Sequence, residues 1–370
     1  MVRRLTVLQM LPALDGGGVE RGTLEVAAAL AGRGHRSMVM SAGGRLVPEL
    51  EAGGSEHLAW GVDRKSPWTL RHVLPLRRLL ARERVDLLHL RSRVPAWVGW
   101  LAWRGMDPAL RPRLVTTVHG LYSVGAYSRV MTRGERVIAV SQTVREYILG
   151  NYPGVDPQRI RVIPRGVDPD AFPYGWRPAS GWLDAWYREH PRLLDVPVLT
   201  LPGRLTRLKG HHAFIDLIAT LRGRGVSVHG LVVGGEDPRR AAYAADLYRA
   251  VAQRGLGGDI TFAGHRADMR EIYAVSDVVC SLSARPESFG RTVLEALSMG
   301  RPVIGYDHGG VGELLAELYP EGAVGLDAPE VLAGRAEAFL QQAPAVPREH
   351  RFTLGRMLAE TLDLYEELAY

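Results

Sequence analysis

Short apolar runs alternate with amphipathic stretches along most of the chain. Each apolar run has the length of a β-strand, and the stretches between them carry apolar side chains at helical spacing. Strands that alternate with helices form a parallel sheet with helices on both faces, so the pattern predicts a doubly wound α/β domain. The runs are 5–11, 36–41, 87–90, 114–118 and 136–141, and the helical stretches include 20–33 and 71–83.

The alternation stops between residues 168 and 197, a stretch that holds five prolines and three tryptophans. It then restarts and predicts a second doubly wound domain, with a terminal amphipathic helix over 354–368. The renewed apolar runs are 197–201, 226–233, 259–263, 277–282, 302–306 and 323–326. We therefore expect a first domain over 1–170, a connection over 171–196, a second domain over 197–347, and a last segment, 348–370, that packs back on the first domain.

Composition narrows the class of protein. No apolar run approaches the ~20 residues that span a bilayer, and a single cysteine, Cys280, forms no internal disulfide. We therefore expect a cytoplasmic protein. The net charge of +6 suits nucleic acid, an anionic membrane surface or an anionic substrate. The arginines are spread through the chain rather than clustered with aromatic residues, which disfavours nucleic acid. Lys65 and Lys209 are the chain's two lysines.

In an open parallel sheet, ligands bind beyond the carboxyl ends of the strands. The first apolar run leads into Asp15-Gly16-Gly17-Gly18, where backbone N–H groups and a helix N-terminus approach a ligand, or where the chain simply turns tightly. A dinucleotide site also needs an acidic residue after the second strand. That strand ends in Ser41-Ala42-Gly43-Gly44, so an NAD site is disfavoured.

Two loops of the second domain carry charges suited to a phosphorylated sugar. Arg204 and Lys209 flank a turn at a strand end, where two cations stabilise a diphosphate leaving group, unless they form an ordinary solvated loop. After the apolar run 277–282 come Glu287 and Glu295, which suit hydroxyl groups of a ligand. If a helix begins near Gly290, Glu287 lies in the loop and Glu295 about one turn into the helix. The alternative is an acid that complements the helix dipole, plus a surface glutamate.

The segment Glu287–Glu295 resembles the E-x-F-G-x-x-x-x-E pattern of the retaining glycosyltransferases of family 4. That family has the GT-B architecture, two facing Rossmann-like domains with a cleft between them. Arg165 departs from the family, which usually has asparagine before Gly-Val-Asp. Other pieces resemble the family in the same order from residue 5 to about 326: Gly16-Gly17-Gly18-Val19-Glu20, Thr117-Val118-His119-Gly120, Val140-Ser141, Ile163-Pro164-Arg165-Gly166-Val167-Asp168, Gly203-Arg204 with Lys209-Gly210, and Gly309-Gly310 with Glu313.

The resemblance implies roles for these residues, including a first domain that binds the acceptor and a second that binds the nucleotide sugar. It implies that Arg204 and Lys209 bind the diphosphate, that Glu295 binds the ribose, and that Gly264 borders the base. It also implies that Glu287 and the amides of Phe289 and Gly290 hold the donor sugar. His119 reaches that sugar from the first domain, and Gly17 and Gly18 count among the donor-binding residues. The resemblance implies neither metal nor cofactor, the nucleotide sugar being a substrate. Asp168-Pro169-Asp170 has the form of a metal motif but falls at the start of the connection.

Arg91 and Arg93 follow another strand of the first domain, where paired guanidinium groups suit phosphate or carboxylate. We expect them to face the cleft and bind an anionic acceptor, or else to brace their loop by pairing with nearby acids. Trp97, Trp100 and Trp103 repeat at every third position and suit either an anionic membrane surface or the core.

These features favour a glycosyltransferase, and the resemblance implies that it is retaining, metal-independent and uses front-face chemistry. The donor would be a nucleoside diphosphate sugar, and the acceptor an anionic cell-envelope saccharide such as lipopolysaccharide core, O-antigen or another lipid-linked glycan. We expect it in the cytoplasm, at the inner face of the membrane. The alternatives are a GT-B nucleotide-sugar epimerase, which needs no acceptor, and a non-catalytic nucleotide or nucleic-acid binding protein.

Overall fold

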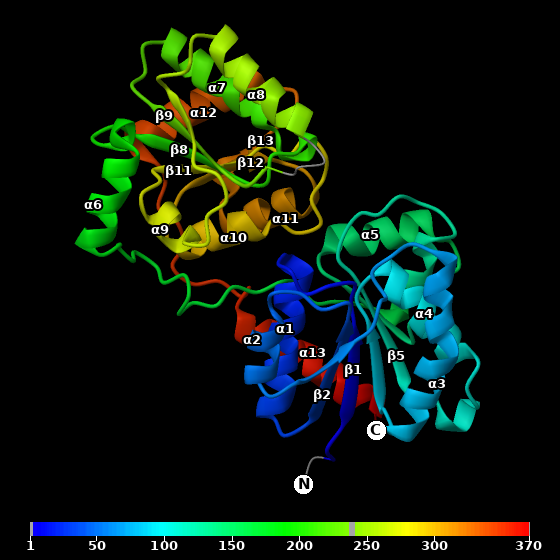
Figure 1. Cartoon of the computed structure of the whole chain (residues 1–370). Helices are drawn as coiled ribbons and strands as arrows, with labels where there is room; N and C mark the ends of the chain where they lie inside the picture. The colour runs from blue at the N-terminus through cyan, green and yellow to red at the C-terminus, as the bar shows by residue number, and fades with distance from the viewer. Residues whose placement is uncertain (1–2, 237–240, 370) are drawn as a thin grey trace. The chain divides into compact units, whose positions relative to one another are not determined.

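The computed structural model describes residues 3–236 and 241–369. The chain divides into two compact units, one formed by Met1–Arg165 with Gly355–Tyr370 and the other by Gly166–Leu354 (Figure 1). Each unit is built on one parallel sheet, as the alternation of apolar runs and helical stretches predicts. In the described part of the chain, no helix is both long and apolar enough to cross a bilayer.

The sheet of the first unit has seven strands in the order β3-β2-β1-β4-β5-β6-β7. All its pairings are parallel, and the central strands are buried along almost their whole length, as expected where helices cover both faces. The strands are β1 (Thr6–Met10), β2 (Arg36–Ser41), β3 (Glu56–Ala59), β4 (Leu87–Leu90), β5 (Arg113–Val118), β6 (Arg136–Ala139) and β7 (Ile160–Val162). The α-helices are α1 (Gly18–Gly32), α2 (Val47–Ala52), α3 (Val73–Arg82), α4 (Arg93–Arg104), α5 (Gln142–Asn151) and α13 (Leu354–Ala369).

The sheet of the second unit has six strands in the order β10-β9-β8-β11-β12-β13. The strands are β8 (Val198–Pro202), β9 (His229–Val233), β10 (Ile260–Phe262), β11 (Val278–Ser281), β12 (Val303–Tyr306) and β13 (Ala323–Val324). The α-helices are α6 (Ser180–Glu189), α7 (His211–Gly223), α8 (Ala241–Gln253), α9 (Met269–Ala274), α10 (Arg291–Ser298), α11 (Gly309–Leu318) and α12 (Pro329–Gln342). These elements follow the six predicted apolar runs closely.

The segment expected as a connection, 171–196, belongs to the second unit. Its helix α6 places Trp186 in a cluster with Val198 and Ile272, and Trp186 is 2 % exposed. The indole of Trp182 stacks on Trp186 and donates a hydrogen bond to Asp268. The tryptophans that interrupt the strand–helix alternation therefore hold this helix against the second unit's core.

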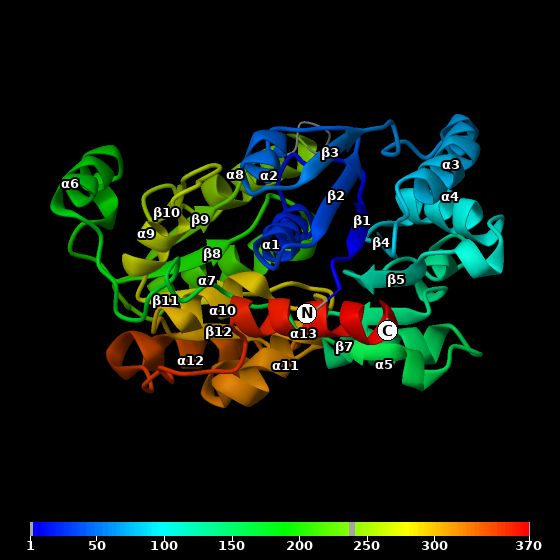
Figure 2. The same ribbon diagram turned by 90° about the horizontal axis from the view of Figure 1, so that it is seen from below.

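The last helix, α13, belongs to the first unit, among elements from the other end of the chain (Figures 1 and 2). The hydroxyl of Tyr365 is hydrogen-bonded to His89 Nδ1 at 2.5 Å, and His89 Nε2 is hydrogen-bonded to Thr117 Oγ1 at 2.6 Å. Arg161 forms an ion pair with Glu367 at the surface. Burial keeps the pKa of His89 well below its usual value, with a further contribution from Arg91. A neutral histidine thus joins α13 to two strands.

Removing the Tyr365 hydroxyl tests the role of this buried contact. Tyr365→Phe leaves His89 Nδ1 in the core without its partner, which we expect to lower the free energy of unfolding by about 1–3 kcal/mol. Urea denaturation of the full chain measures the loss. Tyr248→Phe is the control, because the Tyr248 hydroxyl bonds Glu236 at the surface, and it should change stability by less than about 0.5 kcal/mol. Equal effects of the two variants would contradict the assignment.

Candidate active site at the strand ends

In the second unit's sheet, the order in which successive strands are added reverses between β8 and β11. These two strands are neighbours in the sheet but far apart in sequence. The loops that leave these strands therefore meet, as in other open α/β sheets. Gly210 shows how closely they meet, because a Cβ on this residue would lie 1.7 Å from the Leu282 carbonyl oxygen. Its φ of +74° also favours glycine. The backbone N–H of Ala284 donates to the Leu208 carbonyl at 3.1 Å, which joins the loops further.

Lys209 and Glu287 meet where these loops touch. Lys209 Nζ lies 2.8 Å from Glu287 Oε1, and about a fifth of each side chain is exposed. The hydroxyl of Ser283 donates to the same carboxylate oxygen. Two of the residues proposed for the diphosphate and the donor sugar are thus in direct contact. The sequence analysis did not identify Ser283. Its position just after a strand at this edge of the sheet could have indicated a residue of the site.

Glycines of the next loop shape the turn that follows Glu287. The N–H of Gly310 donates to the Glu287 carbonyl at 2.7 Å, and a Cβ on Gly310 would lie 2.4 Å from Phe289 Cα. Phe289 is buried and its ring packs on Phe352. Gly290, with a φ of +101°, immediately precedes α10. The prediction that a helix begins near Gly290 is confirmed, and it leaves Glu287 in the loop.

Glu295 lies on α10 with its carboxylate largely buried. The hydroxyl of Tyr273 donates to Oε2 at 2.9 Å, and Arg291 Nε donates to Oε1 at 3.0 Å. Burial, together with this carboxylate, raises the pKa of the Tyr273 hydroxyl well above its usual value, so Tyr273 remains a donor. Glu295 is therefore not a surface glutamate, and its orientation is set by two neighbours.

Arg204 and Gly264 occupy the same edge of the sheet, after β8 and β10. Both are exposed, and Gly264 has a φ of +65°. Gly235, after β9, lies between their loops: its carbonyl accepts a hydrogen bond from Leu205 N, and a Cβ on it would lie 3.2 Å from the His265 Cβ. The structure thus brings the predicted residues of the second unit to consecutive loops along one sheet edge.

The strand order of the first unit's sheet also reverses, between β1 and β4. The glycine turn after β1 is followed directly by α1, which begins at Gly18 after Gly17. Four residues on, Gly22 has no room for a side chain, because a Cβ there would lie 2.4 Å from Arg165 Nη1 and 3.4 Å from Arg91 Nη2. The first turns of α1 therefore lie against two guanidinium groups. The sequence signal for this contact was a glycine inside a helical stretch.

Arg91 and Arg93 do not form the expected pair. Arg91 is 2 % exposed and donates to Gln9 Oε1 at 2.8 Å, so this guanidinium lies in the interior rather than on an open face. Arg93 is partly exposed and lies over the rings of Tyr122 and Tyr127 at 4.7 and 5.3 Å. Side chains at successive odd positions diverge here because α4 starts at Arg93, which breaks the period of the strand. Among the residues that the structure describes, neither arginine forms an ion pair with a carboxylate, although the charge of Glu25 partly offsets the effect of burial on the pKa of Arg91.

Of the three tryptophans, Trp100 follows the alternative of core packing, whereas Trp97 and Trp103 are half-buried. The indole nitrogens of Trp97 and Trp103 donate to the carbonyls of Tyr127 and Pro112, and Trp100 is buried.

Among the described residues, no group of three His, Cys, Asp or Glu side chains could hold a metal ion. The carboxylate of Asp168 instead accepts the backbone N–H of Asp170 at 3.0 Å.

His119 follows β5 and receives a hydrogen bond from Arg165. The guanidinium donates to His119 Nδ1, which requires a lone pair on that nitrogen and places the ring proton on Nε2. Burial lowers the pKa of His119 well below its usual value, and the positive charges of Arg165 and Arg91 and the ring of His89 lower it further. His119 is thus a neutral imidazole. Burial is the main cause of the neutral state, and Arg165, the departure from the family pattern, fixes which ring nitrogen carries the proton.

Replacing Arg165 should change how His119 titrates. Arg165→Asn removes a positive charge and the donor to Nδ1, so we expect the pKa of His119 to rise toward 6.5. Histidine NMR between pH 4 and 8 measures the shift, with His119→Gln to assign the signal. Arg161→Asn removes a charge from an exposed arginine of the same unit and should leave the signal unmoved. A titration curve of His119 that is the same in the wild type, Arg165→Asn and Arg161→Asn would overturn the assigned contact.

The comparisons with known proteins agree with this architecture. The model of Glycosyltransferase Family 4 matches residues 16–171, and that of Glycosyl transferases group 1 matches residues 184–353. A glycosyltransferase from Rickettsia africae ESF-5 has a structure that superposes with a TM-score of 0.85, at 29% identity, over 99% of this chain and 98% of that one. An Anabaena protein crystallised with UDP and glucose superposes with a TM-score of 0.79, at 20% identity, over 98% of this chain and all of the other.

Curated relatives match over part of their length. D-inositol 3-phosphate glycosyltransferase of Rhodococcus opacus is 29% identical over 61% of this chain and 53% of its own length. Mannosylfructose-phosphate synthase of Agrobacterium fabrum is 32% identical over 48% of this chain and 38% of its own length. The matched region thus spans about half the length of the curated relatives or less. With both family models matched in order and both Rossmann-like sheets present, the chain belongs to glycosyltransferase family 4, group 1, and has the GT-B fold.

Proposed function

We propose that the protein transfers a glycosyl group, with retention of configuration, from a nucleoside diphosphate sugar to an anionic saccharide of the cell envelope. The observation that carries this proposal is the contact of Lys209 with Glu287 at the ends of β8 and β11. It puts a cation suited to a diphosphate within 2.8 Å of a carboxylate suited to sugar hydroxyls.

Donor binding follows from the loops along this sheet edge. Lys209 and the exposed Arg204 neutralise the diphosphate, and Glu295 accepts the ribose hydroxyls. Gly264 borders the base, and Glu287 with the amides of Phe289 and Gly290 holds the sugar. From the first unit, His119 contributes a neutral Nε2–H donor, and Gly17 and Gly18 contribute backbone N–H groups. Structures of the Anabaena protein contain UDP and UDP-glucose, so uridine diphosphates are the first donors to test.

The transfer replaces one bond at the anomeric carbon by another on the same face. The bond from the anomeric carbon to the diphosphate oxygen breaks, the acceptor oxygen bonds to that carbon, and the acceptor's proton passes to the leaving phosphate oxygen. Lys209 and Arg204 stabilise the charge that develops on the diphosphate, which is the role of a metal ion in other transferases. Glu287 accepts hydrogen bonds from Lys209 and Ser283, which lowers its strength as a nucleophile and suits it to binding.

The acceptor side of the proposal depends on Arg93, since Arg91 is buried. Two relatives have names that contain a phosphorylated compound, inositol 3-phosphate and mannosylfructose phosphate. This agrees with an anionic acceptor. A lipopolysaccharide core or lipid-linked glycan would place the enzyme in the cytoplasm, at the inner face of the membrane.

A thermal-shift screen of UDP, GDP, ADP, CMP and their sugar conjugates tests the donor site. A ligand at 100 times its Kd stabilises the folded chain by about 2.7 kcal/mol, which gives a clear shift in Tm. We expect one base to be selected and Lys209→Ala to weaken it by about 1.5–3 kcal/mol, the contribution of a hydrogen bond to a charged group. EDTA and Mg²⁺ should leave the shift unchanged.

Arg249→Ala provides the matched control for Lys209→Ala. It removes a positive charge from an exposed arginine of the second unit that pairs with Asp246 on α8 and is not among the residues proposed for the donor. Its nucleotide response should equal that of the wild type. Absence of a shift with every nucleotide, or equal losses in both variants, would reject the donor site.

Mass spectrometry tests the assignment of Glu287 as a binding residue. We expect the peptide that contains Glu287 to keep its unmodified mass when turnover is quenched in the presence of donor and acceptor. A glycosyl adduct on Glu287 would show a covalent intermediate, and front-face transfer would then be wrong. A fluorinated donor that slows turnover gives such an adduct time to accumulate.

A further inference from the structure

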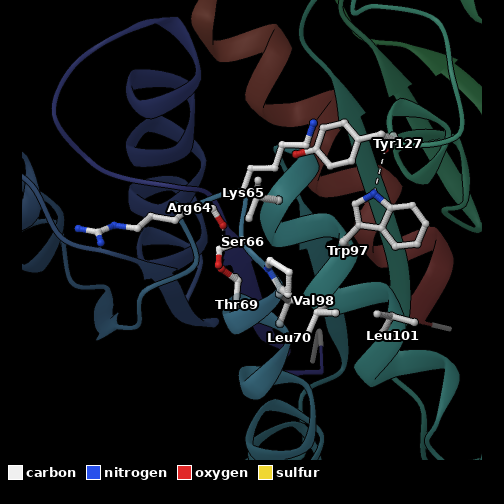
Figure 3. Close-up of a pocket in the computed structure, with 11 residues that line it drawn as sticks. Arg64, Lys65, Ser66, Thr69, Leu70, Trp97, Val98, Leu101 and Tyr127 are labelled. Carbon is white, nitrogen blue, oxygen red and sulfur yellow. Dashed lines mark hydrogen bonds between the residues drawn. The ribbon is translucent and has the colours of Figure 1, made fainter.

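The first unit contains an apolar pocket that the proposed function does not use. It lies between α4 and the 3-10 turn η1 (Pro67–His72) and has a volume of about 440 Å³ (Figure 3). That volume falls in the range of small-molecule sites. Residues that form its wall include Thr69, Leu70, Val94, Trp97, Val98 and Leu101.

Three polar side chains of the wall, those of Trp97, Thr69 and Ser66, have hydrogen-bond partners inside the protein. The indole of Trp97 donates to the Tyr127 carbonyl at 2.9 Å, the dashed line in Figure 3. Thr69 Oγ1 donates to the Arg64 carbonyl at 2.7 Å, and Ser66 Oγ accepts the backbone N–H of Trp68. What the wall offers a ligand is therefore mostly carbon, so a group that enters the pocket should be a hydrocarbon.

Positive charge gathers at one end of the pocket, around the ring of Tyr127. Lys65 Nζ lies 4.4 Å from the ring centre and the Arg93 guanidinium 5.3 Å from it. Among the described residues, no carboxylate pairs with Lys65. Arg64 contributes less, because its side chain extends away from the pocket in Figure 3 and approaches Asp63 at 3.8 Å. Lys65 thus presents a cation at the pocket itself, and Arg93, which is not part of the pocket wall, adds a second positive charge beside the Tyr127 ring.

We propose that this pocket binds a phosphate-bearing amphiphile, with the hydrocarbon chain against Leu70, Trp97 and Leu101 and the phosphate at Lys65, beside the Tyr127 ring. The complementarity of an apolar wall and a cationic rim selects this occupant. Resting on the proposed function, the inference names the acceptor class as a saccharide linked through phosphate to a lipid chain. Lys65 then binds the link between chain and saccharide.

A series of n-alkyl phosphates from four to twelve carbons, kept below their aggregation concentrations, tests the pocket without any turnover. Calorimetry and the change in tryptophan fluorescence report binding. We expect the Kd to fall about fourfold for each added CH₂ and then to level off once the pocket is full. A Kd independent of chain length would overturn the proposal. So would a fall that never levels off and accompanies binding to anionic vesicles, since that describes an apolar face resting on a membrane.

Substitutions of two leucines, one inside and one outside the pocket wall, distinguish binding in the pocket from binding to any exposed apolar surface. Leu70 lines the pocket and is 47 % exposed, whereas Leu74 is 58 % exposed one turn further along, outside the pocket wall. Both positions tolerate a polar side chain without loss of core packing. Leu70→Glu should abolish binding of decyl phosphate, and Leu74→Glu should retain it. Equal losses in the two variants would contradict a bounded pocket.

The cationic rim has its own control. Lys65→Gln should weaken decyl phosphate about tenfold and leave decanol unchanged, because the ammonium contacts only the phosphate. Arg64→Gln should alter neither ligand. If decanol binds as tightly as decyl phosphate, the role of the rim is wrong. These titrations contain no nucleotide and concern the first unit, so failure here is distinguishable from failure of the donor site, which the Lys209 experiment reads.

Discussion

The parallel pairing of β8 with β11 is the constraint on which the candidate site depends. Parallel neighbours end at the same edge of a sheet, and helical crossovers bring distant parts of the chain to that edge. Lys209 and Glu287, separated by 78 positions, can therefore form a 2.8 Å ion pair. The Gly210 backbone passes so close to Leu282 that a side chain at position 210 would push the two loops apart.

β1 and β4 of the first unit are paired in parallel in the same way, but the charged side chains near their ends differ in burial and in partners from those of the second unit. In the second unit, a partly exposed cation faces a carboxylate, and an incoming diphosphate can compete for it. In the first unit, the buried Arg91 bonds a neutral amide and lies near a neutral histidine, so burial lowers the pKa of its guanidinium. The first arrangement leaves a charge partly exposed, whereas in the second the buried charge is used to orient an uncharged group, the amide of Gln9.

Local patterns predicted the elements that have strong apolar runs, and they failed where tertiary contacts decide. The edge strands β3 and β7 are short and half-exposed, so neither carries an apolar run to mark it. At the site, the E-x-F-G pattern located the turn before α10 correctly. The buried state of Arg91 could not be predicted, because it depends on its hydrogen bond to Gln9, 82 positions away. Spacing along one strand carries no information about such partners.

The return of α13 to the first unit has a consequence for synthesis of the chain. Translation delivers β1 through β7 first, then the whole of the second unit, and only afterwards the helix that carries Tyr365. During this interval His89 lacks its partner and the face that α13 will cover is open. The second unit, continuous in sequence from Gly166 to Leu354, can complete its core before the first unit does.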